Sequence, residues 1–133
     1  MPIANVHRAI YAALTSSGVT ICNGIRTAGT ATPVAVYDLT SAEISVSLNG
    51  VSGNNVWVIG LQVVCVADTL EDVCITVDDI VDAIDANYTD TGEAVKIVIT
   101  QFAVAFSTEN IDDGQHDAER VGTITITLQA QEY

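Results

Sequence analysis

The chain has 133 residues and a formal net charge of −13, with 49% hydrophobic and 16% charged residues. This share of apolar side chains excludes intrinsic disorder, because their burial can offset the entropy that the chain loses on folding. The length suits a single domain over residues 1–133, and no stretch approaches the roughly 20 apolar residues that cross a bilayer. We therefore expect one folded domain without a membrane partner.

The first quarter of the chain predicts a helix, a short strand and a polar loop. Apolar residues recur at spacings of three and four over residues 3–15, which predicts an amphipathic helix. Residues 19–22 are predicted to form a short strand. Residues 24–32 are mostly small and polar and include one charged residue, Arg26, so we expect a long loop there.

The next segment predicts a hairpin that leads into a buried strand. Residues 34–37 are predicted to be extended, and residues 43–48 alternate apolar and polar side chains, as a strand with one buried face does. Asn and Gly residues at positions 49–55 mark the loop of the hairpin. Residues 56–66 are apolar at almost every position, which predicts a central strand covered on both faces.

A second helix is predicted from residue 69 to about residue 87. Asp68 or Thr69 supplies a side-chain cap, and acids in the first turn favour the positive end of the helix dipole. The predicted apolar face consists of Leu70, Val73, Cys74, Val77, Ile80, Val81 and Ile84. The predicted solvent face is acidic and consists of Glu71, Asp72, Asp78, Asp79, Asp82 and Asp85. Ile75 lies among these acids, which hints at an interface.

The last two strands are predicted over residues 95–108 and 120–131, joined by an acidic loop at residues 109–119. The final strand alternates Ile, Leu and Ala with Thr and Gln, as a strand with one buried face does. The predicted order is therefore a helix, four strands, a helix and two strands. This order predicts an α+β fold in which two helices cover one face of a mostly antiparallel sheet, with a long hairpin and flexible loops.

The sequence offers little support for catalysis. Cys22, Cys65 and Cys74 show neither the spacing of a zinc site nor the even count of a disulfide framework, so we interpret all three as buried thiols in the core. A Gly-rich phosphate loop, a nucleophile elbow and a cysteine beside a histidine are all missing from the sequence. We therefore expect no enzyme activity, no cofactor and no metal ion.

All of the net charge falls in the second half of the chain. Residues 1–67 carry two basic and two acidic side chains, whereas residues 68–133 carry two basic and fifteen acidic ones. Nucleic-acid binding depends on Lys and Arg to neutralise phosphates, so ordinary DNA or RNA binding is disfavoured. One alternative is that the acids serve only to keep the protein soluble. Another is that the acids at residues 109–119 bind a cation, although their spacing does not match an EF-hand.

A succession of segments is more informative than any single motif. It begins with a helix around residues 6–14, Gly18-Val19-Thr20-Ile21 and a Gly/Thr loop ending in Thr32-Pro33-Val34-Ala35-Val36-Tyr37. A hairpin, a helix at residues 70–85 and a final strand entered through Ala118-Glu119-Arg120-Val121 follow. Over nearly its full length the chain resembles tail terminator proteins, the tail-completion or head-to-tail joining proteins of long-tailed bacteriophages. The β-branched run at residues 73–77 departs from a good helix sequence and leaves the start of that helix open.

The resemblance implies a structural virion protein of the tail or neck, made in the host cytoplasm. Its copies would form a closed ring, commonly hexameric in that family, that caps the tail tube and docks to the head-completion or connector protein. DNA would pass through without specific binding, and the family has no catalytic residues. Because carboxylates repel phosphate, we expect acids at the lumen or rim of the ring: Glu71, Asp78, Asp82, Asp85, Asp112 and Asp113. Long strands such as residues 95–108 can pair across subunits.

Two polar loops, at residues 24–32 and 49–55, are expected to contact the rest of the tail and to become ordered only on assembly. The candidate contact residues in them are Arg26, Thr27, Asn49 and Asn54. Two other classes of function remain open. An acidic DNA mimic would bind basic proteins as a monomer or small dimer, and a small metal-binding domain would use residues 109–119. The mass of the protein in solution separates a mimic from a ring.

Overall fold

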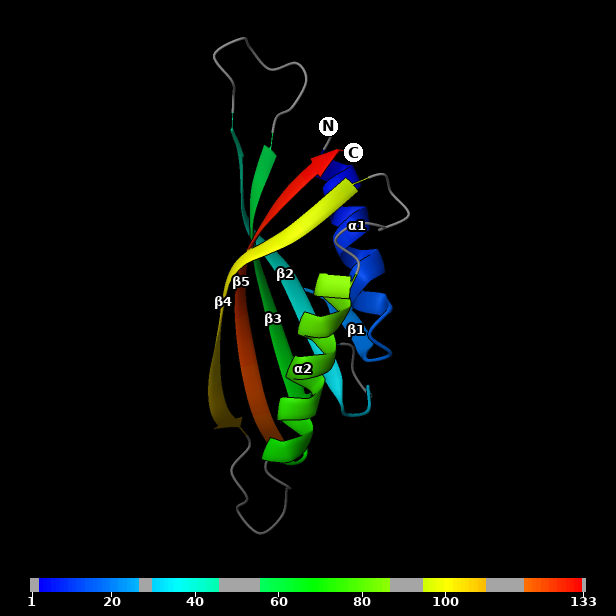
Figure 1. The fold of residues 1–133 in the computed structure, drawn as a ribbon. Helices are drawn as coiled ribbons and strands as arrows, with labels where there is room; N and C mark the ends of the chain where they lie inside the picture. Colours follow the sequence, from blue (N-terminus) through cyan, green and yellow to red (C-terminus); the bar gives the residue numbers. More distant parts are fainter. Residues whose placement is uncertain (1–2, 27–29, 46–55, 87–94, 110–118, 133) are drawn as a thin grey trace.

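The computed structural model describes residues 3–26, 30–45, 56–86, 95–109 and 119–132 (Figure 1). The elements in chain order are α1 (Ile3–Thr15), β1 (Thr20–Asn23), β2 (Val34–Ser45), β3 (Val56–Ala67), α2 (Leu70–Ala86), β4 (Val95–Glu109) and β5 (Glu119–Glu132). Within these residues the strands form one five-stranded sheet in the order β1-β2-β3-β5-β4. β1 pairs with β2 in parallel, and the other three pairings are antiparallel. Both helices lie on one face of the sheet, which confirms the predicted α+β fold.

The first helix forms where its periodicity predicts. Its buried residues are Val6, Ala9, Ile10, Ala13 and Leu14, the apolar stripe of the sequence. The hydroxyls of Ser16 and Ser17 donate hydrogen bonds of 2.6 Å to the carbonyls of Ala13 and Leu14, which satisfies acceptors at the helix end. Gly18 then turns the chain with a φ of +80°, a conformation that glycine adopts without strain.

β2 joins two segments that the sequence analysis separated. Residues 34–37 and 43–45 belong to one strand, whose register shifts between Leu39 and Ser41 at a β-bulge. Opposite the bulge, a Cβ at Gly60 of β3 would lie 2.5 Å from Ser41 Oγ and 2.7 Å from Thr40 Oγ1. The bulge in β2 therefore requires glycine at position 60 of β3. The bulge in turn lets β2 continue through a polar stretch.

The core lies between the sheet and the two helices. Alternate residues of β3 and β5 face the helices and are buried: Ile59, Leu61, Val63, Cys65, Ala67, Ile124, Ile126, Leu128 and Ala130. The prediction that the strand at residues 56–66 is covered on both faces is wrong for most of its length, because no described helix covers the other face. That outer face instead holds a small second cluster at one end, where Val34, Val66 and Val121 pack together.

α2 begins at Leu70, which settles the helix start that the β-branched run left open. The backbone N–H of Asp72 donates a hydrogen bond to Thr69 Oγ1, and the backbone N–H of Val73 donates one to the Thr69 carbonyl. Each donor–acceptor distance is 3.1 Å. The buried face is Val73, Thr76, Val77, Ile80, Ala83 and Ile84. Neither helix in the described part of the chain has the length and hydropathy to span a membrane.

The predicted apolar face of α2 needs correction at three positions. Leu70 and Cys74 are exposed and Val81 is half-buried, whereas Thr76 is buried. The apolar arc of the helix is wider than its contact with the sheet, so residues at its margin remain in solvent. Thr76 tolerates burial because its hydroxyl donates a 2.8 Å hydrogen bond to the Asp72 carbonyl.

Candidate functional site

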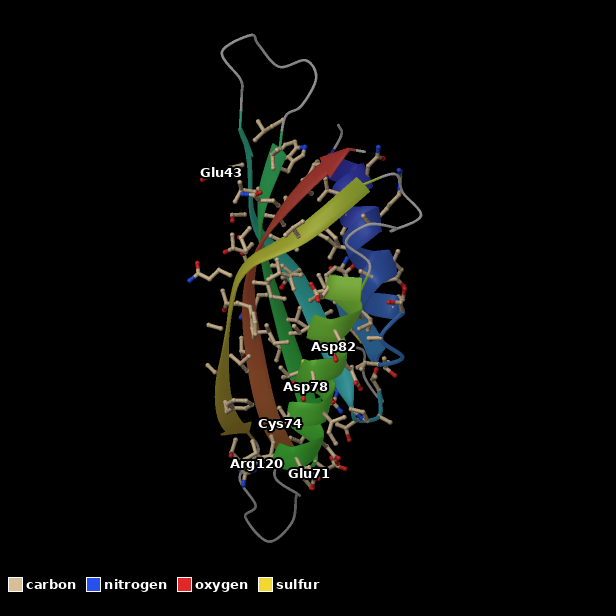
Figure 2. All side chains as sticks on the ribbon, viewed as in Figure 1. Glu43, Glu71, Cys74, Asp78, Asp82 and Arg120 are labelled. Carbon is tan, nitrogen blue, oxygen red and sulfur yellow. The ribbon has the colours of Figure 1, made fainter. Side chains whose placement is uncertain are left out.

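The solvent-exposed side of α2 is acidic. Glu71, Asp78, Asp82 and Asp85 are all exposed, and Figure 2 shows the first three along the helix. Their spacings of seven, four and three residues place them on one side of the helix. The structure therefore brings four of the six predicted rim acids onto one surface. The other two, Asp112 and Asp113, lie outside the described residues.

An uncharged surface lies on the opposite side of the sheet. Residues 56–67 of β3, 97–108 of β4 and 121–131 of β5 contain no charged residue. The helix-free face of these adjacent strands carries Val, Thr, Gln, Ala and Ser, for example the cross-strand rows Gln62–Thr125–Ala103 and Val64–Thr123–Ala105. Most of these side chains are exposed or half-buried. The lack of charge in these strands is visible in the sequence, but only the strand order brings them together on one surface.

Arg26 crosses one end of this outer face. Its Nη1 donates a 2.8 Å hydrogen bond to Glu119 Oε2, forming an ion pair, and its Nη2 donates one of 2.8 Å to the Thr30 carbonyl. Beside the pair is an open pocket of about 450 Å³, lined in part by Asp38 and Val64. Arg26, a candidate contact for a partner carboxylate, therefore already has a carboxylate partner within the chain. The other candidate contacts, Thr27, Asn49 and Asn54, lie outside the described residues.

A hydrogen-bonded polar pair joins α1 to β2. His7 Nε2 and the Tyr37 hydroxyl are 2.9 Å apart and share a hydrogen bond, and the two rings stack with centroids 5.9 Å apart. Burial raises the pKa of the Tyr37 hydroxyl, and the neighbouring Tyr11 raises it further. Tyr37 is only 2% exposed, and His7 is half-buried. We assign it a role in packing.

The described residues do not bring metal ligands together. Across these ranges, no three His, Cys, Asp or Glu side chains are close enough to hold a metal ion. The candidate cation loop falls outside them, apart from its terminal residues Glu109 and Glu119. The cation-binding alternative therefore stays a prediction.

The three cysteines differ in exposure. Cys65 is buried in the core, Cys22 is half-buried and Cys74 is exposed, so the prediction of three buried thiols is wrong for Cys74. Cys74 follows Val73, which faces β5, and lies one helical turn from Glu71 and Asp78. The close packing of Val73 and Val77 over Gly122 of β5 sets the rotation of α2, and that rotation turns Cys74 outward.

Thiol titration should separate these cysteines. Burial raises the pKa of the Cys65 thiol to about 12, so at pH 8 this side chain has almost no reactive thiolate and no access to reagent. We expect a disulfide reagent to modify Cys74 rapidly in the native protein and Cys65 only after unfolding in guanidinium chloride. The variant Cys74→Ser should lose the most rapid phase. If the most rapid phase persists in Cys74→Ser, the assignment of that phase to Cys74 is wrong.

Comparisons with known proteins give only distant structural similarity. No family model matches the chain, and no curated protein matches its sequence. One similar solved structure is a chain of the virion of a native gene transfer agent particle, with a TM-score of 0.46, 10% identity, and coverage of 93% of this chain and 92% of that chain. Another is a sheath/tube terminator of an extracellular contractile injection system in its extended state, with a TM-score of 0.41 and 9% identity. That similarity covers 96% of this chain and 56% of the other, so the chain spans about half the length of the terminator structure.

Proposed function

We propose that this protein is a structural subunit of a phage-like tail, a tail terminator whose copies close into a ring. The ring caps the tail tube, joins it to the head connector and leaves a channel through which DNA passes. The observation that carries the proposal is the separation of charge in the fold. Carboxylates occupy the exposed side of α2, whereas residues 56–67 of β3, 97–108 of β4 and 121–131 of β5 bring no charge to the outer face. A subunit of this kind can contact its neighbours through uncharged surface and keep its acids in solvent.

The acidic side of α2 suits a lumen or rim. The chain has 17 Asp and Glu but only four Lys and Arg, so most carboxylates cannot find a cationic partner in another copy. Burying unpaired carboxylates between subunits costs several kcal/mol each. Acids that remain in solvent around a channel repel the phosphates of DNA, so DNA moves past them without binding.

Lysines on this side of α2 should create DNA binding without preventing assembly. In the double variant Asp78→Lys/Asp82→Lys, we expect rings to form and nonspecific affinity for duplex DNA to rise about tenfold or more at low salt, because Lys attracts phosphate. A matched control is the double variant Asp38→Lys/Glu43→Lys on β2, which changes the net charge of the chain by the same amount as the α2 variant. Gel-shift titrations at two salt concentrations measure the effect. Loss of assembly in the α2 variant alone would place these acids between subunits and contradict the proposal.

The proposed ring is tested first by its mass. Light scattering after size-exclusion chromatography should give a defined oligomer of the 14.0 kDa chain, and electron microscopy should show closed rings with a central opening. A monomer or small dimer that binds basic proteins with steep salt dependence would instead support a DNA mimic. Stabilisation of the monomer by Ca²⁺ would support the metal-binding alternative.

A further inference from the structure

β4 forms a long edge of the sheet. It pairs with β5 on one side, and no described strand lies on its other side. With 15 residues it extends for about 50 Å, whereas β1 at the opposite edge has four residues. An edge strand presents a row of backbone N–H and C=O groups that another strand can pair with.

This edge lacks the features that usually prevent such pairing. Natural edge strands are protected by charged side chains, by proline or by bulges. Residues 97–108 contain no charged residue and no proline, and their register with β5 is interrupted only between Ile99 and Gln101. Residues 101–108 therefore form an uninterrupted, uncharged edge.

Two aromatic side chains beside this edge are half exposed. Phe102 and Phe106 are 50% and 52% exposed, although they pair with Ile126 and Gly122 on the helix-covered side of the sheet. Phe102 borders an open pocket of about 380 Å³ that Val81 and Ile99 also line, and Asp85 is the one acid among the described residues that line it. The helices therefore leave the margin of the core uncovered along β4.

Charge indicates which partner fits this edge. A basic partner would gain most from contacts with the carboxylates of α2, and residues 97–108 of β4 provide no carboxylate. A second copy of this chain also carries a net charge of −13, so it is repelled by most acidic surfaces of the first. Residues 97–108 are a surface where a like-charged chain approaches without burying a carboxylate from this strand.

We infer that the β4 edge, with Phe102 and Phe106, is a contact surface for a second copy of this chain. The inference rests on the proposal that copies assemble, and it adds the surface through which they meet. The neighbouring copy covers the two phenylalanine rings and supplies groups to the free backbone edge of residues 101–108.

A matched pair of lysine variants tests the inference. Phe102→Lys lies on the edge, and Tyr11→Lys replaces an aromatic residue of α1 that is 47% exposed. Each substitution makes the chain less acidic by one charge, so general repulsion between copies decreases in both. We expect Phe102→Lys to weaken self-association about tenfold or more and Tyr11→Lys to leave it unchanged, as measured by light scattering over a concentration series.

Hydrogen exchange of the unaltered protein gives a second measurement that does not depend on how a variant folds. Amides of residues 101–108 should exchange more slowly in concentrated, assembled protein than in dilute protein, whereas those of β1 serve as an internal comparison for the other edge. Equal exchange at residues 101–108 in both states would overturn the inference.

The outcomes also separate this inference from the proposed ring. A ring lost only in Phe102→Lys supports both, and a dimer lost only in Phe102→Lys supports the β4 contact and contradicts a closed ring. A ring that survives Phe102→Lys without protection at residues 101–108 overturns the β4 contact and leaves the ring in place. A protein that stays monomeric at every concentration overturns both.

Discussion

Gly122→Val should lower the free energy of unfolding by about 2–3 kcal/mol, because α2 packs directly on this glycine. A Cβ at this position would lie 2.7 Å from Val73 Cγ1 and 3.3 Å from Val77 Cγ2. β5 is held between β3 and β4, so it cannot move away from the helix without disturbing both ladders. The added side chain must therefore displace α2 or adopt a strained rotamer.

Urea unfolding measures this loss, and two further variants test its cause. Gly122→Ala should cost less, and its combination with Val73→Ala should cost less than the sum of the two single losses, because the second change removes the methyl group nearest to the new Cβ. Thr123→Val, at the next position and on the outer face, should change stability by less than about 0.5 kcal/mol. Wild-type stability in Gly122→Val would show that α2 does not pack on β5 this closely.

Leu61→Ala should cost about 2–5 kcal/mol, since it opens a cavity in the middle of the core. Leu61 is fully buried and lies in the sheet between Leu39 of β2 and Ile126 of β5. Its neighbours are held by strand pairing on both sides, so they cannot collapse fully into the space that the substitution leaves.

Val58→Ala is the matched control on the same strand. Val58 is half-buried on the outer face, which no described helix covers, so its truncation should cost less than about 1 kcal/mol. Thermal or urea unfolding of the isolated protein compares the two variants. Equal losses would show that both faces of β3 are covered to the same degree, as the sequence alone predicted.

The elements of this fold follow from local patterns in the sequence. The spacing of three and four over residues 3–15 determines α1, and the strict alternation of β5 determines both its conformation and its buried face. Thr69 determines the start of α2 despite the β-branched residues that follow. The acidic side of α2 was also predictable, because it needs only the period of a helix and the positions of the acids.

The tertiary structure decided the features that depend on residues far apart in the chain. The bulge opposite Gly60 makes β2 one strand, and the strand order leaves β4 at an edge, which no local pattern specifies. Arg26 meets Glu119 across 93 residues. Cys74 is exposed because Gly122, a residue of β5, fixes the rotation of α2. Periodicity tells which side of an element is apolar, but register, strand order and close packing between elements determine how much of that side is buried.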